Sequence, residues 1–341
     1  MGRTLKIAVL PGDGIGPEIT KETVKVIKST GVNIDWDVVE GGMTALHKYH
    51  DPLPQELLDS IERNKIALKG PLTTPIGKGF RSINVALRKE FDLYVNLRPA
   101  ISFKGVPTIH VDHLDLVIVR ENLEEFYSGV EHYIDHTHSA AETIGIVTKG
   151  ACQRIVRYAF EYARKHGRKK VTAVHKANIM KFTGGIFLNA AEEIAPEYPD
   201  IFFNDKIIDN MAMQMVMNPH QFDVIVTTNL FGDILSDLAS GLVGGLGVAP
   251  GANIGYKVGI FEAVHGSAPD IAGKNIANPT AQILGAAIML DHIGEIEASQ
   301  KIQTAISNVL KKGKYLTRDL TKNNHVTTDV FGDAVVREIE Q

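Results

Sequence analysis

The sequence predicts an α/β fold, and three observations carry that prediction. Short β-rich segments alternate with amphipathic stretches in the first 70 residues, and the same alternation returns between residues 151 and 229. The sequence shows no internal repeat that would indicate a repeat architecture instead. Such alternation is typical of βαβ units that build a largely parallel sheet. With 341 residues and 44% hydrophobic content, the chain is long enough for about two domains with sizeable cores.

The amino-terminal part predicts the alternation most clearly. We expect strand, helix, strand, helix and strand in turn, at residues 5–10, 17–31, 32–40, 55–64 and 65–70. Pro17 in a first helical turn and Gly31 just after a last one are the residues favoured at helix ends.

The turn between the first strand and the first helix is rich in glycine. Gly12 and Gly14 fit the dinucleotide-binding fingerprint, but Pro17 stands where the third glycine belongs, with Gly16 one place early. Glycine also supplies the positive φ that a tight turn needs. The pattern therefore leaves a phosphate-binding loop open as an interpretation but favours a plain strand-to-helix turn.

The middle and the carboxyl end complete the alternation. We expect three more helix–strand pairs, at residues 151–167 and 169–175, 184–195 and 201–209, and 210–221 and 222–229. Residues 125–148 break the helical period and predict two extended segments around a polar turn, as in an edge hairpin or an arm. Apolar residues spaced three and four apart predict helices at 278–294 and 296–313.

The overall charge excludes several classes of partner. The 36 basic and 40 acidic residues give a formal net charge of -4 without a long block of one sign, so we expect no binding to nucleic acid or to an anionic membrane. No apolar run reaches the ~18 residues that a membrane helix needs. Small molecules are the expected partners.

The cysteine content and the start of the chain bear on its compartment. Cys152 is the single cysteine, so no intrachain disulfide can form, and we expect a buried, inert thiol in a reducing compartment. The sequence enters a strand almost at once, which leaves no room for a leader peptide. We expect a cytoplasmic protein or a processed organelle form.

Two carboxylates after the strand that ends near Asn229 suggest a metal site. Asp233 and Asp237 are four residues apart in a helical pattern, so they share one face among Leu and Ile residues. Like charges at this spacing repel unless a cation intervenes. Hard oxygen ligands indicate Mg²⁺ or Mn²⁺, and the alternative is an acid at a helix N-terminus with a chance neighbour.

Several arginines would suit a substrate with more than one carboxylate. Arg120 ends a predicted strand, and the segment 81–98 carries Arg81, Arg88 and Arg98 with Ser82 and Asn84. A guanidinium can hold a carboxylate through two hydrogen bonds. Taken singly, each arginine is more often a surface salt-bridge partner.

Three further features could carry chemistry. Lys176 ends a predicted strand, where α/β folds present active-site residues, and Tyr127 lies beside a glycine at the start of the expected arm. Lys and Tyr side chains can exchange protons with a substrate, although most are a solvated amine and a packed ring. The loop 261–279, which contains His265, is rich in small residues and could wrap a nucleotide or merely connect two elements.

Together these motifs resemble the β-decarboxylating dehydrogenases, the family of isocitrate, 3-isopropylmalate and homoisocitrate dehydrogenases. The resemblance covers essentially the whole chain. It rests, in the family's order, on LPGDGIGPEI, GPLTTPIGKGFRSINVALR, LRP, VRENLEEFYSG, HKANIMKFTGG, NLFGDILSDLASGLVGGLGVAPGANIG and FEAVHGSAPDIAGKNIANP. It implies an isopropylmalate dehydrogenase-like two-domain fold with a central mixed sheet, a protruding dimer arm and no Rossmann fingerprint. The large domain would combine residues 1–98 and 245–341, and the small domain would span 99–244.

The resemblance also implies a role for each candidate residue. The substrate carboxylates common to the family would bind Arg88, Arg98 and Arg120, and the proton-handling pair would be Tyr127 and Lys176. The metal ligands would be Asp209, Asp233 and Asp237. The nicotinamide cofactor would lie against Thr74, Glu262, His265, Gly266, Ser267, Ala268, Asp270, Ile271 and Asn278.

The family builds each active site across a homodimer, and higher oligomers are also compatible with the sequence. Lys176 and Asp209 would then come from the neighbouring subunit, and the arm at 125–148 would clasp the dimer. A non-catalytic regulatory subunit is the competing hypothesis. Every matched position here carries the functional residue type, which favours an enzyme.

Two pairs of positions predict specificity within the family. Ser82 and Asn84 resemble the pair that hydrogen-bonds the third carboxylate of isocitrate, with homoisocitrate and 3-isopropylmalate as alternatives. Asp270 and Ile271 stand where NADP-dependent relatives carry Lys and Tyr, and an aspartate repels the 2′-phosphate, so NAD is expected. Basic residues at 318 and 322 argue in the opposite direction.

Overall fold

The computed structural model describes residues 4–73, 82–108 and 113–341, which form two compact units. The first unit consists of Met1–Phe91, Ile101–His113 and Ser240–Gln341, and the second of Asp92–Ala100 and Leu114–Ala239. Residues 92–98, which the sequence-based boundary puts in the large domain, belong to the second unit, and residues 101–113 and 240–244, which it puts in the small domain, belong to the first. The first difference arises because strand β4 (Val95–Ile101) lies beside β5 (Asp115–Glu121).

The first unit is built on a mixed sheet with the strand order β2-β1-β3-β12-β11. Its strands are β1 (Leu5–Leu10), β2 (Ile34–Val38), β3 (Ile66–Lys69), β11 (Pro250–Ile254) and β12 (Gly259–Ala263). The neighbours β2-β1, β1-β3 and β3-β12 run parallel, whereas β11 and β12 are antiparallel. The expected α/β architecture with a mixed sheet is confirmed.

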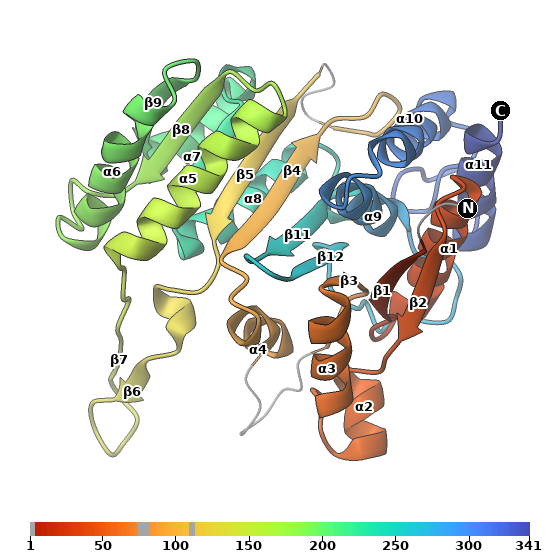
Figure 1. Ribbon diagram of the computed structural model, residues 1–341, viewed down its shortest axis with the longest axis horizontal. Coiled ribbons are helices and arrows are strands. Elements are labelled where there is room, and N and C mark those ends of the chain that lie inside the picture. Colours follow the sequence, from red (N-terminus) through yellow and green to blue (C-terminus); the bar gives the residue numbers. More distant parts are fainter. Residues whose placement is uncertain (1–3, 74–81, 109–112) are drawn as a thin grey trace. The chain divides into compact units, whose positions relative to one another are not determined.

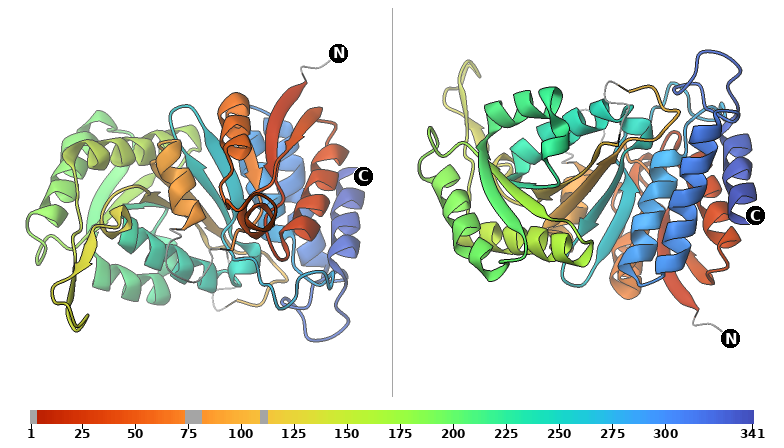
Figure 2. Two further views of the ribbon diagram at one scale, coloured as in Figure 1. Left: turned by 90° about the horizontal axis from the view of Figure 1, so that it is seen from below. Right: turned by 90° about the horizontal axis from the view of Figure 1, so that it is seen from above.

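Helices cover this sheet and complete the core of the first unit. They are α1 (Gly16–Ser29), α2 (Gly42–Tyr49), α3 (Gln55–Asn64), α4 (Ile83–Glu90), α9 (Thr280–His292), α10 (Ile296–Lys312) and α11 (Thr328–Ile339). Figure 2 shows α9, α10 and α11 packed side by side with α1, and α9 also packs on β11 and β12. Helix α9 is apolar on all sides because it lies between the sheet and the other helices.

The second unit repeats the same construction around the strand order β4-β5-β10-β8-β9. Its remaining strands are β8 (Lys170–His175), β9 (Phe202–Ile207) and β10 (Val224–Thr227), and its helices are α5 (Lys149–Lys165), α6 (Thr183–Ile194), α7 (Ile208–Met217) and α8 (Asn229–Leu242). In Figure 1, α5 and α6 lie in front of this sheet, with α7 and α8 behind it. Strands β5, β10, β8 and β9 run parallel to one another, so their carboxyl ends meet at one edge.

A hairpin extends from the second unit between η1 (Phe126–Ser128) and α5 (Figure 1). Its strands β6 (Glu131–Tyr133) and β7 (Ala141–Thr143) pair antiparallel, and their side chains are exposed. At its tip the carboxylate of Asp135 accepts hydrogen bonds from Thr137 and Ser139. The two extended segments around a polar turn are therefore confirmed.

Two smaller expectations concern Cys152 and membranes. Cys152 is buried in α5, and burial raises the pKa of its thiol to about 12, which leaves little thiolate at neutral pH. Among the described residues we find no helix whose length and apolar content would let it cross a lipid bilayer.

Candidate active site

The centre of the second unit's site is Arg120, the penultimate residue of β5. Its side chain is 1% exposed, yet it carries a full positive charge. The Nε and Nη2 groups donate to Oδ1 of Asn229 at 3.0 and 2.7 Å, and Nη1 donates to Asp233, with which it forms an ion pair. A buried guanidinium is thereby held by side chains of α8, the helix that follows the neighbouring strand β10.

Tyr127 completes this cluster. It lies on η1 and donates its hydroxyl hydrogen to Asp233 Oδ2. The guanidinium carbon of Arg120 lies over the Tyr127 ring, 5.0 Å from the ring centroid. Burial raises the pKa of the Tyr127 hydroxyl, the carboxylate of Asp233 raises it further, and Arg120 lowers it. The phenol is therefore protonated at neutral pH and available as a proton donor.

Asp233 and Asp237 lie one turn apart on α8, as expected. The Asp233 side chain is 42% exposed and Asp237 is exposed, so carboxylate oxygens on this face of the helix are accessible to an ion. Within the described part of a single chain, no three His, Cys, Asp or Glu side chains gather as a metal site. Asp209 is thus not joined to the other two aspartates within one copy of the chain.

Lys176 and Asp209 instead form an ion pair of their own. Lys176 follows the last residue of β8, and Asp209 lies in the first turn of α7. The Lys176 ammonium donates to Asp209 and holds the pKa of that carboxyl group below its usual value. Asp209 is well exposed, so the pair faces outward from the unit.

The other expected substrate residues lie on two elements. Arg98 is on β4 of the second unit, where its Nε donates to Oδ1 of the buried Asn96 at 2.5 Å. Ser82, Asn84 and Arg88 belong to the start, first turn and last turn of α4 in the first unit. Oδ1 of Asn84 is buried without a hydrogen-bond partner among the described residues, so it can accept a bond from a ligand. Thr74 and Arg81 lie outside the described residues.

Three loops of the first unit converge on the glycine turn. Ile15 donates its backbone N–H to Ser267 O at 2.9 Å, and the hydroxyls of Thr73 and Ser267 are 2.5 Å apart. Gly14 has φ +58°, and a Cβ there would lie 1.9 Å from Ser267 O. The glycines therefore form a strand-to-helix turn that packs tightly against the 265–278 loop.

Asp13 connects these loops through hydrogen bonds. It is buried, and its carboxylate accepts hydrogen bonds from the backbone N–H groups of Met43 at 2.9 Å and Thr73 at 2.8 Å. Its own N–H donates to Pro71 O at 2.7 Å. One carboxylate thus connects the glycine turn both to the start of α2 and to Thr73.

The 265–278 loop presents small and polar groups. His265 Nδ1 donates to Gly266 O at 3.0 Å, and its Nε2 is buried without a partner among the described residues. Burial lowers the pKa of the imidazole. The His265 ring is therefore neutral and has a nitrogen to offer a ligand. Glu262, at the end of β12, is buried in an ion pair with Lys69 and accepts from Asn253 Nδ2 at 2.6 Å.

Farther along this loop, Asp270 is exposed to solvent whereas Asn278 is buried. Asp270 is exposed, and its backbone oxygen accepts from Lys274 Nζ at 2.7 Å. Ile271 and Ala268 pack against Ile15 and Ala277. Asn278 is buried and donates from Nδ2 to Asp319 Oδ2 at 2.9 Å, which links this loop to the segment that carries Arg318.

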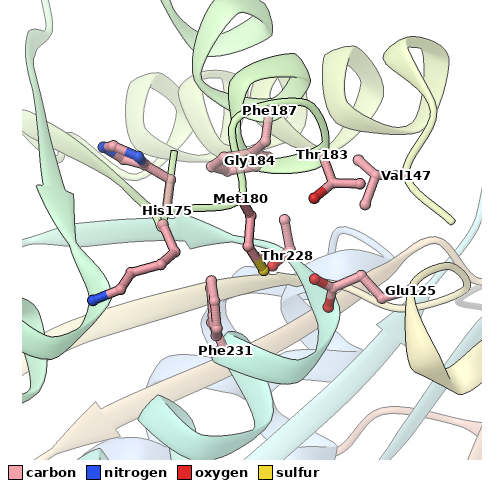
Figure 3. Close-up of a pocket in the computed structure, with 10 residues that line it drawn as sticks. Glu125, Val147, His175, Met180, Thr183, Gly184, Phe187, Thr228 and Phe231 are labelled. Carbon is pink, nitrogen blue, oxygen red and sulfur yellow. The ribbon is translucent and has the colours of Figure 1, made fainter. Parts of the chain in front are cut away.

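A small cavity lies beside Lys176 in the second unit (Figure 3). Its volume is about 10 Å³, the space of one water molecule and too little for a substrate. In Figure 3 the carboxylate of Glu125 is turned toward this cavity. Burial raises the pKa of the Glu125 carboxyl group, while the backbone N–H of Leu230 donates to it at 2.6 Å.

Sequence reasoning missed four residues that shape these sites. Asn229 and Asn96 hold two of the arginines, Asp13 holds the glycine turn, and Lys69 pairs with Glu262. Asp13 and Asn229 stand inside motifs that the sequence singles out, but nothing in their spacing tells which backbone or side-chain group they face.

The fold and these clusters place the chain among α/β proteins with two units. The chain matches the isocitrate/isopropylmalate dehydrogenase family over residues 6–335, and it belongs to that family.

Individual relatives are similar over most of the chain. A crystal structure of isocitrate dehydrogenase from Methylococcus capsulatus has 55% sequence identity and a TM-score of 0.95, covering 99% of this chain and 100% of the other. A probable isocitrate dehydrogenase [NAD] subunit alpha, mitochondrial, from Drosophila melanogaster is 48% identical over 93% of this chain and 83% of its own. An isocitrate dehydrogenase [NADP] from Thermus thermophilus is 47% identical over 99% of this chain and 68% of its own.

Proposed function

We propose that this protein catalyses the NAD-dependent, metal-assisted oxidation and decarboxylation of isocitrate to 2-oxoglutarate and CO₂. The observation that carries the proposal is the cluster of Arg120, Tyr127 and Asp233, which places an anion-binding cation, a proton donor and a metal-ligand carboxylate in direct contact. The relatives named for isocitrate dehydrogenase activity support the choice of substrate.

The substrate carboxylates bind to arginines. Arg88, Arg98 and Arg120 bind the two carboxylates common to the family's substrates, since a guanidinium carries five N–H donors and a permanent positive charge. Ser82 and Asn84 bind the third carboxylate of isocitrate. A site with such polar groups rejects 3-isopropylmalate, because an isopropyl group would leave them unpaired.

Asp209, Asp233 and Asp237 would hold Mg²⁺ or Mn²⁺. The donor set fits, because all three are carboxylates, and the exposed Asp237 shares one face of α8 with Asp233, whose side chain is 42% exposed. When bound, the ion supplies Lewis acidity toward the hydroxyl and the adjacent carboxylate of the substrate. Because Asp209 is apart from Asp233 and Asp237 within one chain, we infer that a second copy contributes it, together with Lys176.

Protons move through Lys176 and Tyr127. Lys176 would accept the proton of the substrate hydroxyl group. NAD, when bound, would supply the acceptor for the hydride from the carbon that carries this hydroxyl group. The bond to the neighbouring carboxylate then breaks and CO₂ leaves. Tyr127, which is protonated at neutral pH, returns a proton to the resulting enolate carbon.

NAD rather than NADP is the proposed cofactor. Asp270 is exposed on the loop expected to meet the adenosine ribose, and a carboxylate there attracts a ribose diol but repels a 2′-phosphate. Two features argue for measuring NADP as well. One is the Thermus thermophilus relative named for NADP, and the other is the Asn278–Asp319 hydrogen bond, which brings the segment of Arg318 to this loop.

We further propose a homodimer formed through the second unit. Exposed apolar side chains lie on α7, on α8 and on the hairpin, among them Met213, Met217, Ile234, Tyr133 and Ile134. An isolated two-stranded hairpin is marginally stable in water, so a partner that covers it is expected. The alternative is a mixed complex, as the word subunit in the Drosophila melanogaster relative's name suggests.

The test is NADH formation by the purified protein with Mg²⁺, compared for isocitrate, homoisocitrate and 3-isopropylmalate, with NADP in a parallel series. We expect the highest kcat/KM with isocitrate and NAD, and a dimer by light scattering. Higher kcat/KM with either other acid would move the substrate assignment to that acid. No turnover with any combination would favour a non-catalytic regulatory subunit.

A further inference from the structure

Asn229 is the first residue of α8 and is fully buried. Its Oδ1 accepts two hydrogen bonds from one guanidinium, from Nε and Nη2 of Arg120. Its Nδ2 donates to the backbone oxygen of Glu124 at 3.2 Å. The orientation of the amide is therefore fixed, because the oxygen faces donors and the nitrogen faces an acceptor.

Gly232 restrains the same arginine from one turn further along. A Cβ at position 232 would lie 2.4 Å from Cγ and 2.6 Å from Cβ of Arg120, so the stem of the arginine fills the space that a side chain would need. The arginine is held at its stem by Gly232 and at its Nε–Nη2 edge by Asn229. Nη1 is the group that remains directed at Asp233.

The chemical nature of the acceptor matters here. The guanidinium already has one carboxylate partner, Asp233 at Nη1. An amide oxygen carries no net charge, so Asn229 orients the Nε–Nη2 edge without adding a second. An aspartate of the same shape would place a second negative charge at hydrogen-bond distance and compete with any anion for Arg120. Arg98 is held in a similar way, with its Nε bonded to the buried amide of Asn96.

We propose that Asn229 is a positioning residue that fixes the orientation of the Arg120 guanidinium for binding a substrate carboxylate, without placing a second negative charge beside it. This inference rests on the proposed function, in which Arg120 binds a carboxylate of isocitrate. It predicts that Asn229 governs the affinity for the acid and has little effect on the affinity for the dinucleotide.

The test compares Asn229→Asp with a matched control, Asn122→Asp. Asn122 is also buried in the second unit, and its Nδ2 also donates to a backbone oxygen, that of Leu93 at 2.8 Å. Both changes remove such a donor and bury a carboxylate, but it is Asn229 that accepts the hydrogen bonds from Nε and Nη2 of Arg120. For each variant we would measure KM for isocitrate, KM for NAD, kcat, and isocitrate affinity by calorimetry with Mg²⁺.

We expect Asn229→Asp to raise KM and Kd for isocitrate by about 10- to 100-fold, the range for losing a charge-assisted hydrogen bond, with KM for NAD nearly unchanged. Asn122→Asp should leave both KM values near those of the wild type. Equal effects of the two variants on isocitrate, or equal increases of both KM values for Asn229→Asp, would overturn the proposal.

Two further measurements keep the outcomes separate. If Asn229→Asp does not fold, Asn229→Ser decides, because it adds no charge and still removes the amide that spans Nε and Nη2. Its KM for isocitrate should rise about tenfold, and an unchanged value would overturn the proposal. A wild type that is inactive with isocitrate would instead refute the proposed function itself.

Discussion

The arginine cluster of the second unit and the converging loops of the first unit are held together by different kinds of contact. In the cluster, Arg120, Tyr127 and Asp233 stand on regular elements and contact one another through side chains that carry charge or a transferable proton. In the loops, backbone groups and short hydroxyls make the contacts, with Asp13 bonded to the N–H groups of Met43 and Thr73.

The difference predicts how each region fails when it is altered. A change in the cluster removes a reactive or charged group and should act on kcat or on the affinity for the acid. A change in the loops displaces backbone and should act on the affinity for the dinucleotide and on stability. The following variants are chosen to break or sharpen this contrast.

The largest effect is expected for Lys176→Ala. Losing a positioned general base costs about 10²- to 10⁴-fold in kcat, and binding of NAD should remain, since Lys176 lies in the second unit. Stopped assays of NADH formation and calorimetry with NAD measure the two quantities. Lys301→Ala, at an exposed position of α10, is the control and should behave as the wild type. A Lys176→Ala enzyme with wild-type kcat would remove this lysine from the proton-handling pair.

Asp13→Asn tests the loops. One carboxylate oxygen becomes an amide NH₂ group that faces a backbone N–H, which leaves a buried donor unsatisfied at a cost of about 1 to 3 kcal/mol. We expect KM for NAD to rise about 10-fold or more and the free energy of unfolding to fall, with kcat changed less than by Lys176→Ala.

The control for Asp13→Asn is Asp51→Asn. Asp51 also accepts a backbone hydrogen bond, from Leu53 at 2.9 Å, but it is exposed at the surface of the same unit. It should change neither KM nor stability appreciably. If Asp13→Asn altered KM for isocitrate as strongly as KM for NAD, the assignment of these loops to the dinucleotide would be wrong.

A third variant, Asp233→Asn, addresses the metal. Removing one anionic ligand should weaken the affinity for Mg²⁺ at least about tenfold while NAD binding is retained. Titration of Mg²⁺ in the presence of isocitrate measures the change. Unchanged Mg²⁺ affinity would exclude Asp233 from the ligand set.

Periodicity in the sequence was enough to predict most of the framework. The predicted strand at 5–10 and helix at 55–64 coincide with β1 and α3, because an apolar run and an amphipathic repeat are local properties. Helices α2 and α11 were not predicted. Helix α2 is short, starts after Gly41 without a side-chain cap, and depends on the distant Asp13 for bonds to its first N–H groups.

The site was predictable as a set of residues but not as a set of contacts. Arg120 and Asp233 are 113 positions apart in the sequence, and their ion pair depends on the parallel pairing of β5 with β10, which brings the start of α8 to Arg120. The amide of Asn229 became recognisable only once that geometry was known. Long-range pairing of this kind leaves no trace in local periodicity.

The smallest effect is expected for the pH dependence that His265 contributes. Burial lowers the pKa of its imidazole below the ordinary value of 6.5, so the unfolded chain binds this proton more readily than the folded one. As the pH falls through 6.5, the free energy of unfolding should therefore fall as well, by less than about 1.4 kcal/mol per pH unit for one proton. His265→Gln should flatten this part of the profile, as measured by urea denaturation between about pH 7.5 and 5.5. An identical slope in the variant would mean that this imidazole titrates alike in the folded and unfolded chain, and would remove the argument that it meets the dinucleotide as a neutral ring.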